Sequence, residues 1–242
     1  MALGKGDPAS YRQELGVGKS IYATVLGDDF HRLHPKIQER FGFDSRSGKR
    51  AIGRGVMDRV WRGRFYTLPF LQIGTWRNIM FPEQGVDVPF TIENWAYVDT
   101  LGRETVTELR TFQLGRERRF DAYMVRDPIR NTVVDYMGTH QHLAVDLNLS
   151  VAENGGLRIV SGDQRFYEGP IAFKFPMLFS GKAHVYVWFD DEIERYHIEV
   201  EVKSETWGPL FGFCGTFDVE WEEVDTGNLP KSIMPRRVES CY

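Results

Sequence analysis

From Ile52 onward the chain repeats one pattern, in which short stretches of alternating apolar and polar residues are separated by turn-forming residues. The turns recur about every ten residues, which is the spacing of an all-β sandwich or barrel. Gly, Asn and Asp favour such turns because they tolerate the backbone conformations that reverse the chain. Most of the 242 residues are therefore expected to form β-structure.

The clearest hairpin pairs residues 183–189 with residues 196–202 through a turn at residues 191–194. Alternate side chains of a strand point to opposite faces, so Val185 and Val187 share one face while His184, Tyr186 and Trp188 share the other. The first face suits a core and the second is mixed. Further strands are expected at residues 90–98, 103–112, 120–125, 132–136, 143–151, 157–159, 171–175 and 213–221.

The N-terminal part lacks this pattern. Residues 1–19 are expected to form a flexible tail, and residues 20–45 a helical segment with helices at 20–26 and 35–41. Residues 20–242 form a single β-rich domain. The favoured fold is one antiparallel β-barrel, lipocalin-like, with the helices packed on one end. The alternative is an α+β cup of the lipid-transfer type, but Pro230 and Pro235 interrupt the C-terminal helix that such a cup needs.

Composition and motifs narrow the function classes. The net charge of −4 disfavours nucleic-acid binding, which depends on many Lys and Arg side chains. The sequence has no stretch of eighteen apolar residues that would predict a membrane span, and its first twenty residues lack the apolar run of a signal peptide. Two cysteines give no disulfide framework, so a cytoplasmic location is expected. Residues 16–20 resemble the end of a phosphate-binding loop, but Gln13 replaces its first Gly, and no cofactor is expected.

A polar row in residues 140–148 is the strongest candidate for chemistry. If these residues are a strand, His140, His142 and Asp146 project from one face, and the predicted hairpin brings Glu168 alongside His140. Two imidazoles and a carboxylate can act as acid, base or orienting group when they line a cavity. The same alternation fits a face turned to water, or a structural hydrogen bond between histidine and carboxylate. The pair of histidines also resembles part of a cupin metal motif, but Asp146 stands where that motif has Glu, and no metal site is predicted.

Aromatic residues supply the candidate ligand contacts. The mixed face of the 183–202 hairpin carries three of them opposite His197, and Phe166 lies beside His142 in the predicted register. Residues 207–213 place apolar bulk where Gly and Pro forbid a regular strand. This loop either folds over a pocket mouth, plugs one barrel end or binds a partner protein. The candidate ligand-binding residues are His184, Tyr186, Trp188, His197, Phe166, Trp207 and Phe211.

Six separated strings agree in order with one bacterial family. They are Ser20-Ile21-Tyr22, Asp29-Phe30-His31-Arg32-Leu33-His34-Pro35, Gly55-Val56-Met57-Asp58-Arg59-Val60-Trp61, Gly138-Thr139-His140-Gln141-His142, Gln164-Arg165-Phe166-Tyr167-Glu168-Gly169 and Trp207-Gly208-Pro209-Leu210-Phe211-Gly212. Through them the chain resembles the family catalogued as domain of unknown function 4166, over nearly all of its length after Lys19. Similar domains are fused behind saccharopine-dehydrogenase-like Rossmann domains. The resemblance therefore implies a metabolic setting and a Rossmann-type dehydrogenase as partner, and it assigns no catalytic residue.

These observations favour the binding of a small, largely apolar metabolite inside a barrel, because a barrel of about eight or more strands can hold one ligand. A second hypothesis is a cofactor-independent acid/base isomerase or cyclase that acts on such a metabolite. A third is a protein-interaction module that works through the loop at residues 207–213.

Overall fold

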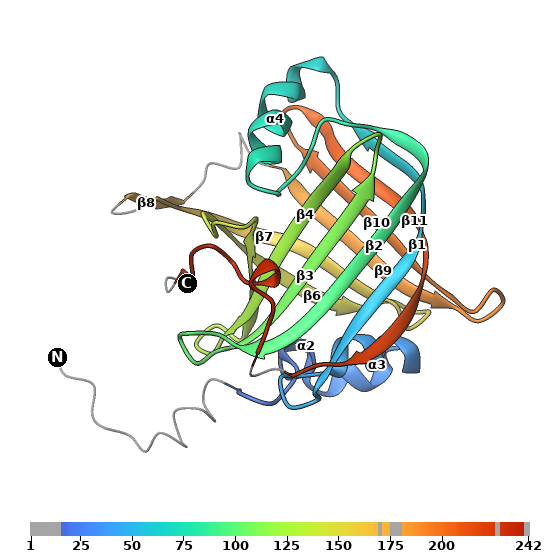
Figure 1. Ribbon diagram of the computed structural model, residues 1–242, viewed down its shortest axis with the longest axis vertical. Coiled ribbons are helices and arrows are strands. Elements are labelled where there is room, and N and C mark those ends of the chain that lie inside the picture. The colour runs from blue at the N-terminus through green and yellow to red at the C-terminus, as the bar shows by residue number, and fades with distance from the viewer. Residues whose placement is uncertain (1–15, 169–170, 175–180, 226–227, 240–242) are drawn as a thin grey trace.

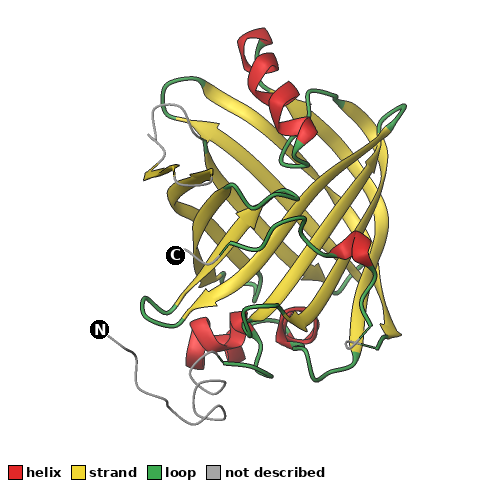
Figure 2. Ribbon diagram, turned by 60° about the vertical axis from the view of Figure 1, so that its left-hand side comes forward, coloured by secondary structure: helices red, strands yellow, loops and turns green. Residues whose placement is uncertain are grey.

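The computed structural model describes residues 16–168, 171–174, 181–225 and 228–239. Most of the predicted N-terminal tail, residues 1–15, lies outside the described residues. Within them, ten antiparallel strands form a closed barrel (Figures 1 and 2). The mainly-β barrel predicted from the turn spacing is confirmed.

The strands are β1 (Lys49–Arg62), β2 (Gly85–Val98), β3 (Glu104–Gln113), β4 (Glu117–Asp127), β5 (Thr132–Met137), β6 (Leu143–Val151), β7 (Leu157–Glu168), β8 (Ile171–Lys174), β9 (Lys182–Asp190), β10 (Arg195–Ser204) and β11 (Gly208–Glu223). Most of them pair with their neighbours in sequence, while β1 pairs with β11 from the other end of the chain. The order β6-β5-β4-β3-β2-β1-β11-β10-β9-β7 closes through pairing of β6 with β7, and β8 extends β7 outside the ring. Closure leaves the ring without an open sheet edge.

The predicted register of the β9–β10 hairpin is confirmed, with Val185 opposite Val200 and Trp188 opposite His197. The β6–β7 register differs from its prediction. Val151 pairs with Leu157 as expected, but a bulge opposite residue 146 shifts the pairing, so Gln164 lies opposite Val145 and Phe166 opposite Leu143. A bulge adds one residue to one strand and so displaces every later pair by one position.

Short helices cover both ends of the barrel. At one end lie α2 (Ile21–Leu26) and α3 (Pro35–Gly42), joined by the 3-10 helix η1 (Gly27–Arg32), and both helices were expected (Figure 1). Ser20 caps α2 by accepting a hydrogen bond from the Ala23 N–H. At the other end η2 (Phe65–Thr67) leads into α4 (Leu68–Trp76), which was not predicted. Pro69 lies in its first turn, where the missing N–H of proline does no harm.

Glu104 fastens the N-terminal segment to the barrel. Its buried carboxylate accepts hydrogen bonds from the N–H of Gly18 at 2.8 Å, the N–H of Ser45 at 2.6 Å and the hydroxyl of Ser45 at 2.7 Å. Three donors from two separate segments thus converge on one side chain of β3. This arrangement holds the helices against their end of the barrel.

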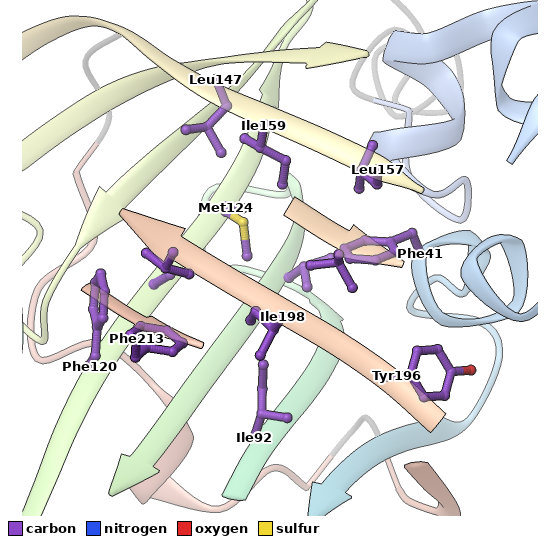
Figure 3. Close-up of a cluster of buried hydrophobic side chains, with 14 of the residues drawn as sticks. Phe41, Ile92, Phe120, Met124, Leu147, Leu157, Ile159, Tyr196, Ile198 and Phe213 are labelled. Carbon is purple, nitrogen blue, oxygen red and sulfur yellow. The ribbon is translucent and has the colours of Figure 1, made fainter. Parts of the chain in front are cut away.

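Phenylalanines fill much of the interior. Phe112 contacts Phe81, Phe90 and Phe213, with ring centroids 5.0–5.1 Å apart. Aliphatic side chains from several strands point toward one another in the same space (Figure 3). Each buried aromatic ring removes a large apolar area from water and so stabilises the interior.

The C-terminal segment packs on the outside of the barrel. The 3-10 helix η4 (Lys231–Ile233) buries Ile233 against Trp95, Tyr97 and Leu109 on the outer face of β2 and β3. Further on, the Arg236 N–H donates to the Thr139 carbonyl at 2.8 Å. The outer side chains of β3 are therefore buried as well as the inner ones. No helix in the described part of the chain is long and apolar enough to cross a membrane.

Candidate functional site

A cavity of about 350 Å³ remains inside the barrel. At the α4 end, Ile73 and Trp207 line it while 60% and 42% exposed, so the cavity meets solvent there. At the opposite end Tyr22 and Phe41 line it and are buried, so the two N-terminal helices close it. The aliphatic side chains of its middle wall are Met137, Leu143, Val145, Leu147, Ile159, Val185, Val187, Ile198, Val200 and Val202.

Charged side chains stand at the closed end of this apolar space. Arg40 from α3, Glu108 and Arg110 from β3 and Asp135 from β5 all line the cavity. Glu108 contacts both guanidinium groups, that of Arg40 at 3.6 Å, and accepts a hydrogen bond from the Asn94 amide at 2.7 Å. We call Arg40, Glu108, Arg110 and Asp135 the polar floor.

The surroundings shift the pKa values of Glu108 and Arg40. Burial alone favours neutral Glu108, but the neighbouring Arg110 and Arg40 outweigh it and lower the pKa of the carboxyl group. Arg40 stacks over the ring of Phe217 at 4.8 Å, and burial lowers the pKa of the Arg40 guanidinium group below its ordinary value. Glu108 is thus a carboxylate held between two cations.

Asp135 differs from Glu108 because it has no comparable partner. Burial raises the pKa of Asp135 to about 7; Arg110 and a backbone hydrogen bond from Tyr123 oppose the shift, and Glu108 adds to it. Its Oδ1 is buried without a hydrogen-bond partner. A carboxyl group that titrates near neutral pH inside a cavity can accept or donate a proton.

The polar floor also holds donors without acceptors. Nε and Nη1 of Arg40 and Nε of Arg110 are buried with no hydrogen-bond partner. Each unsatisfied buried donor costs about 1–3 kcal/mol. A polar group on a bound molecule would offset this penalty, while the rest of the cavity accommodates apolar surface.

Sequence reasoning missed the polar floor, although a signal for it exists. In β3 the inward row reads Val106, Glu108, Arg110, Phe112, and in β5 Asp135 stands between Val133 and Met137. Charged residues between apolar ones at two-residue spacing indicate charges on the core face. The outer face of β3 is itself buried, which hides this alternation.

His140 and His142 lie outside the barrel. Residues 138–142 form a turn before β6 begins at Leu143, and Gln141 adopts a left-handed φ of 52°. The two imidazole rings nevertheless stack 5.6 Å apart, and Nδ1 of His142 lies 3.5 Å from Arg237 of the C-terminal segment. Neither histidine lines the cavity. Of the predicted polar row, Asp146 lies in β6 and the two histidines lie in the turn before it, so they do not share one strand face.

Of the two predicted carboxylates, Asp146 is held by two arginines. Asp146 accepts hydrogen bonds from Arg165 at 2.5 and 3.0 Å and from Arg130 at 2.5 Å. Burial would raise its pKa, but these guanidinium groups lower the pKa below its ordinary value. The side chain of Glu168 lies outside the described residues. Among the residues that the structure describes, no group of three or more His, Cys, Asp or Glu is placed to hold a metal ion.

The mixed face of the β9–β10 hairpin also points outward. Tyr186 stacks on Trp188 at 4.5 Å, Trp188 stacks on His197 at 4.6 Å, and Arg158 lies over the ring of Tyr186 at 4.4 Å. His184 is exposed on the same face. The predicted register was correct, but the cavity lies behind the opposite row, which carries Val185 and Val187.

The loop predicted at residues 207–213 is wrong beyond Trp207, because β11 begins at Gly208 and carries Phe211. Trp207 lines the open end, where its carbonyl accepts a hydrogen bond from the Tyr66 hydroxyl at 2.7 Å. Phe211 is fully buried against Phe81 and belongs to the phenylalanine core. Phe166 stacks on His142 with ring centroids 6.0 Å apart.

Comparison with known proteins identifies relatives. The family model described as Domain of unknown function (DUF4166) matches residues 33–217. The uncharacterised protein YndH of Bacillus subtilis (strain 168) is 32% identical over 205 residues, which cover 84% of this chain and 98% of that relative. No solved structure matches the chain.

Proposed function

The chain belongs to the family described as Domain of unknown function (DUF4166), and from the geometry of its barrel we propose that it binds one small, largely apolar molecule in the interior. The observation that carries the proposal is the cavity, which has an aliphatic wall, one open end and one polar end. Ligand sites in proteins share this combination of apolar lining and a few placed polar groups.

The cavity volume limits the ligand. The volume of 350 Å³ lies at the small end of the ~300–1,000 Å³ range of ligand pockets, so small probes are suitable. Decanoate, 1-decanol and decylamine share an unbranched ten-carbon chain and differ only in the head group. Native mass spectrometry should show a 1:1 complex with at least one of them.

A cavity-filling variant tests where the probe binds. Val185→Trp puts an indole into the cavity, while His184→Trp puts the same indole on the outer face of the same strand. We expect Val185→Trp to weaken binding by about tenfold or more, which is about 1.4 kcal/mol, and His184→Trp to leave it unchanged. If overpacking unfolds Val185→Trp, the smaller change Ala183→Leu tests the same point. Equal affinities in all variants would place the probe outside the barrel and contradict the proposal.

A second candidate is cofactor-independent acid/base chemistry on the bound molecule, and Asp135 is the observation that favours it. Its carboxyl group faces an apolar cavity and titrates near pH 7, where a proton-transfer group is most effective. In deuterated buffer the protein should accelerate α-proton exchange of 2-decanone, and Asp135→Asn should abolish the acceleration. If 2-decanone binds but its α-protons exchange at the uncatalysed rate, Asp135 does not have this activity.

We also propose a cellular compartment and two kinds of partner. The cytoplasm as compartment is supported by the low cysteine content and by the free thiol of Cys214. A Rossmann-type dehydrogenase partner is supported only by the family resemblance. A protein partner that binds at Trp207, in the turn before β11, is supported by the exposed surface of Trp207. Co-purification that is lost on Trp207→Ala, with the fold intact, would identify such a partner.

A further inference from the structure

We propose that the polar floor recognises an acidic head group, so that the ligand is an apolar molecule ending in a carboxylate, and that Asp135 takes up a proton when it binds. This inference rests on the proposed function and adds the chemical class of the ligand. The juxtaposition behind it is two cavity-lining arginines with unsatisfied donors beside one carboxyl group that can be neutralised.

The charge balance of the polar floor favours an anion once Asp135 is protonated. Arg40 and Arg110 contribute two positive charges, and Glu108 and Asp135 contribute two negative charges when both are ionised. Protonated Asp135 therefore leaves one positive charge uncompensated at the closed end of an apolar cavity. A buried uncompensated charge is unfavourable, and an incoming carboxylate neutralises it.

Geometry supports the same head group. Arg40 and Arg110 are 2% and 8% exposed, and their unpartnered nitrogens are donors that need acceptors. A carboxylate is the acceptor that guanidinium groups bind best, because two oxygens match two N–H groups. The protonated carboxyl of Asp135 supplies a further donor. An alcohol offers one acceptor oxygen without charge, and an ammonium group offers none.

The groups facing Asp135 determine the pH dependence. They are Arg110 and Glu108 from β3 and Tyr22 from α2. Burial raises the pKa of Tyr22 well above its usual value, the pKa of Glu108 is lowered, and arginine side chains stay protonated in proteins, so among these groups only Asp135 titrates between pH 6 and pH 9. Binding of a carboxylate therefore requires proton uptake above about pH 7 and none below about pH 6.

Isothermal titration of the full chain with decanoate, 1-decanol and decylamine from pH 6 to pH 9 tests the inference. Decanoate stays ionised throughout, so its affinity should be highest at pH 6 and should fall by close to tenfold per pH unit above about pH 7. Titrations repeated at pH 8 in buffers of different ionisation enthalpy should show that the protein takes up close to one proton for each decanoate that binds. Decanol should show no pH dependence, and decylamine should bind more tightly as the pH rises.

Asp135→Asn keeps the shape of the side chain and makes it permanently neutral. In this variant decanoate should bind with the same affinity at every pH, and at pH 8 at least as tightly as to the wild type. Asp218→Asn, on the exposed outer face of β11, is the control and should keep the wild-type pH dependence. Circular dichroism checks that both variants fold.

Tighter binding of decanol or decylamine than of decanoate at pH 6 would overturn the acidic head group while leaving the apolar binding site in place. A decanoate affinity that does not change with pH in the wild type, or changes equally in Asp135→Asn, would overturn the role of Asp135. Failure of all three probes to bind would overturn both this inference and the proposed function.

Discussion

Asp135 makes the stability of the free protein depend on pH. Its pKa is raised by burial to about 7, so the folded protein holds this proton over a range in which the unfolded chain has lost it. This group therefore favours folding below its unfolded pKa, and its contribution is lost as the pH rises to about 7. Asp135→Asn should gain stability relative to the wild type between pH 4 and pH 7, at up to about 1.4 kcal/mol per pH unit, and level off above.

Urea unfolding of the two proteins at pH 5, 6, 7 and 8 measures this difference. Asp218→Asn is again the matched control, because its carboxylate is exposed and paired with Arg195 on the barrel surface. Parallel stability curves for Asp135→Asn and the wild type would show that Asp135 ionises normally in the folded protein.

Prediction from sequence succeeded and failed at the residue scale for identifiable reasons. Alternation correctly placed Asp146 on the opposite face of β6 from Val145 and Leu147, because strand geometry fixes the relation between side chains. It could not tell which face meets the interior, since that depends on how the whole ring closes. Asp135 went unnoticed because a single acid in a short strand normally indicates a solvent-facing position.

Among the elements, β3 connects the barrel to its N-terminal helices through Glu104. Glu104→Gln would replace one acceptor oxygen by an amide that faces an N–H donor of Gly18 or Ser45. We expect a loss of about 1–3 kcal/mol in unfolding free energy and faster amide hydrogen exchange in α2 and α3. The control is Glu117→Gln, because Glu117 is exposed at the start of β4. Unchanged exchange in α2 and α3 would show that other contacts hold the helices.

Elements with strong local signals were predictable. The β9–β10 hairpin was paired residue by residue, because its two alternating rows admit one register that buries the apolar side chains. The β6–β7 bulge and helix α4 were not. A bulge leaves the hydrophobic pattern almost unchanged, and α4 is nine residues long with a proline and a glycine inside it. Its position is stabilised by packing on the barrel end rather than by helix propensity.

For the whole molecule, ring closure is what turns a set of hairpins into a container. Closure of β6 on β7 places the inner rows of ten strands around one space, and the phenylalanines fill only part of it. The sequence predicted a barrel and an interior ligand, yet most of the residues proposed to contact that ligand lie on the outer surface or in the core. The volume left empty depends on side-chain packing across the ring, which no local pattern specifies.

The most direct test of the binding site is the crystal structure of the protein with a terminally brominated form of whichever ten-carbon probe binds. We expect an anomalous bromine signal inside the barrel near Ile73 and Trp207, with the head group at Arg110 and Asp135. A bromine signal on the outer face, for example on the stack of Tyr186 and Trp188, with the interior unchanged, would contradict it.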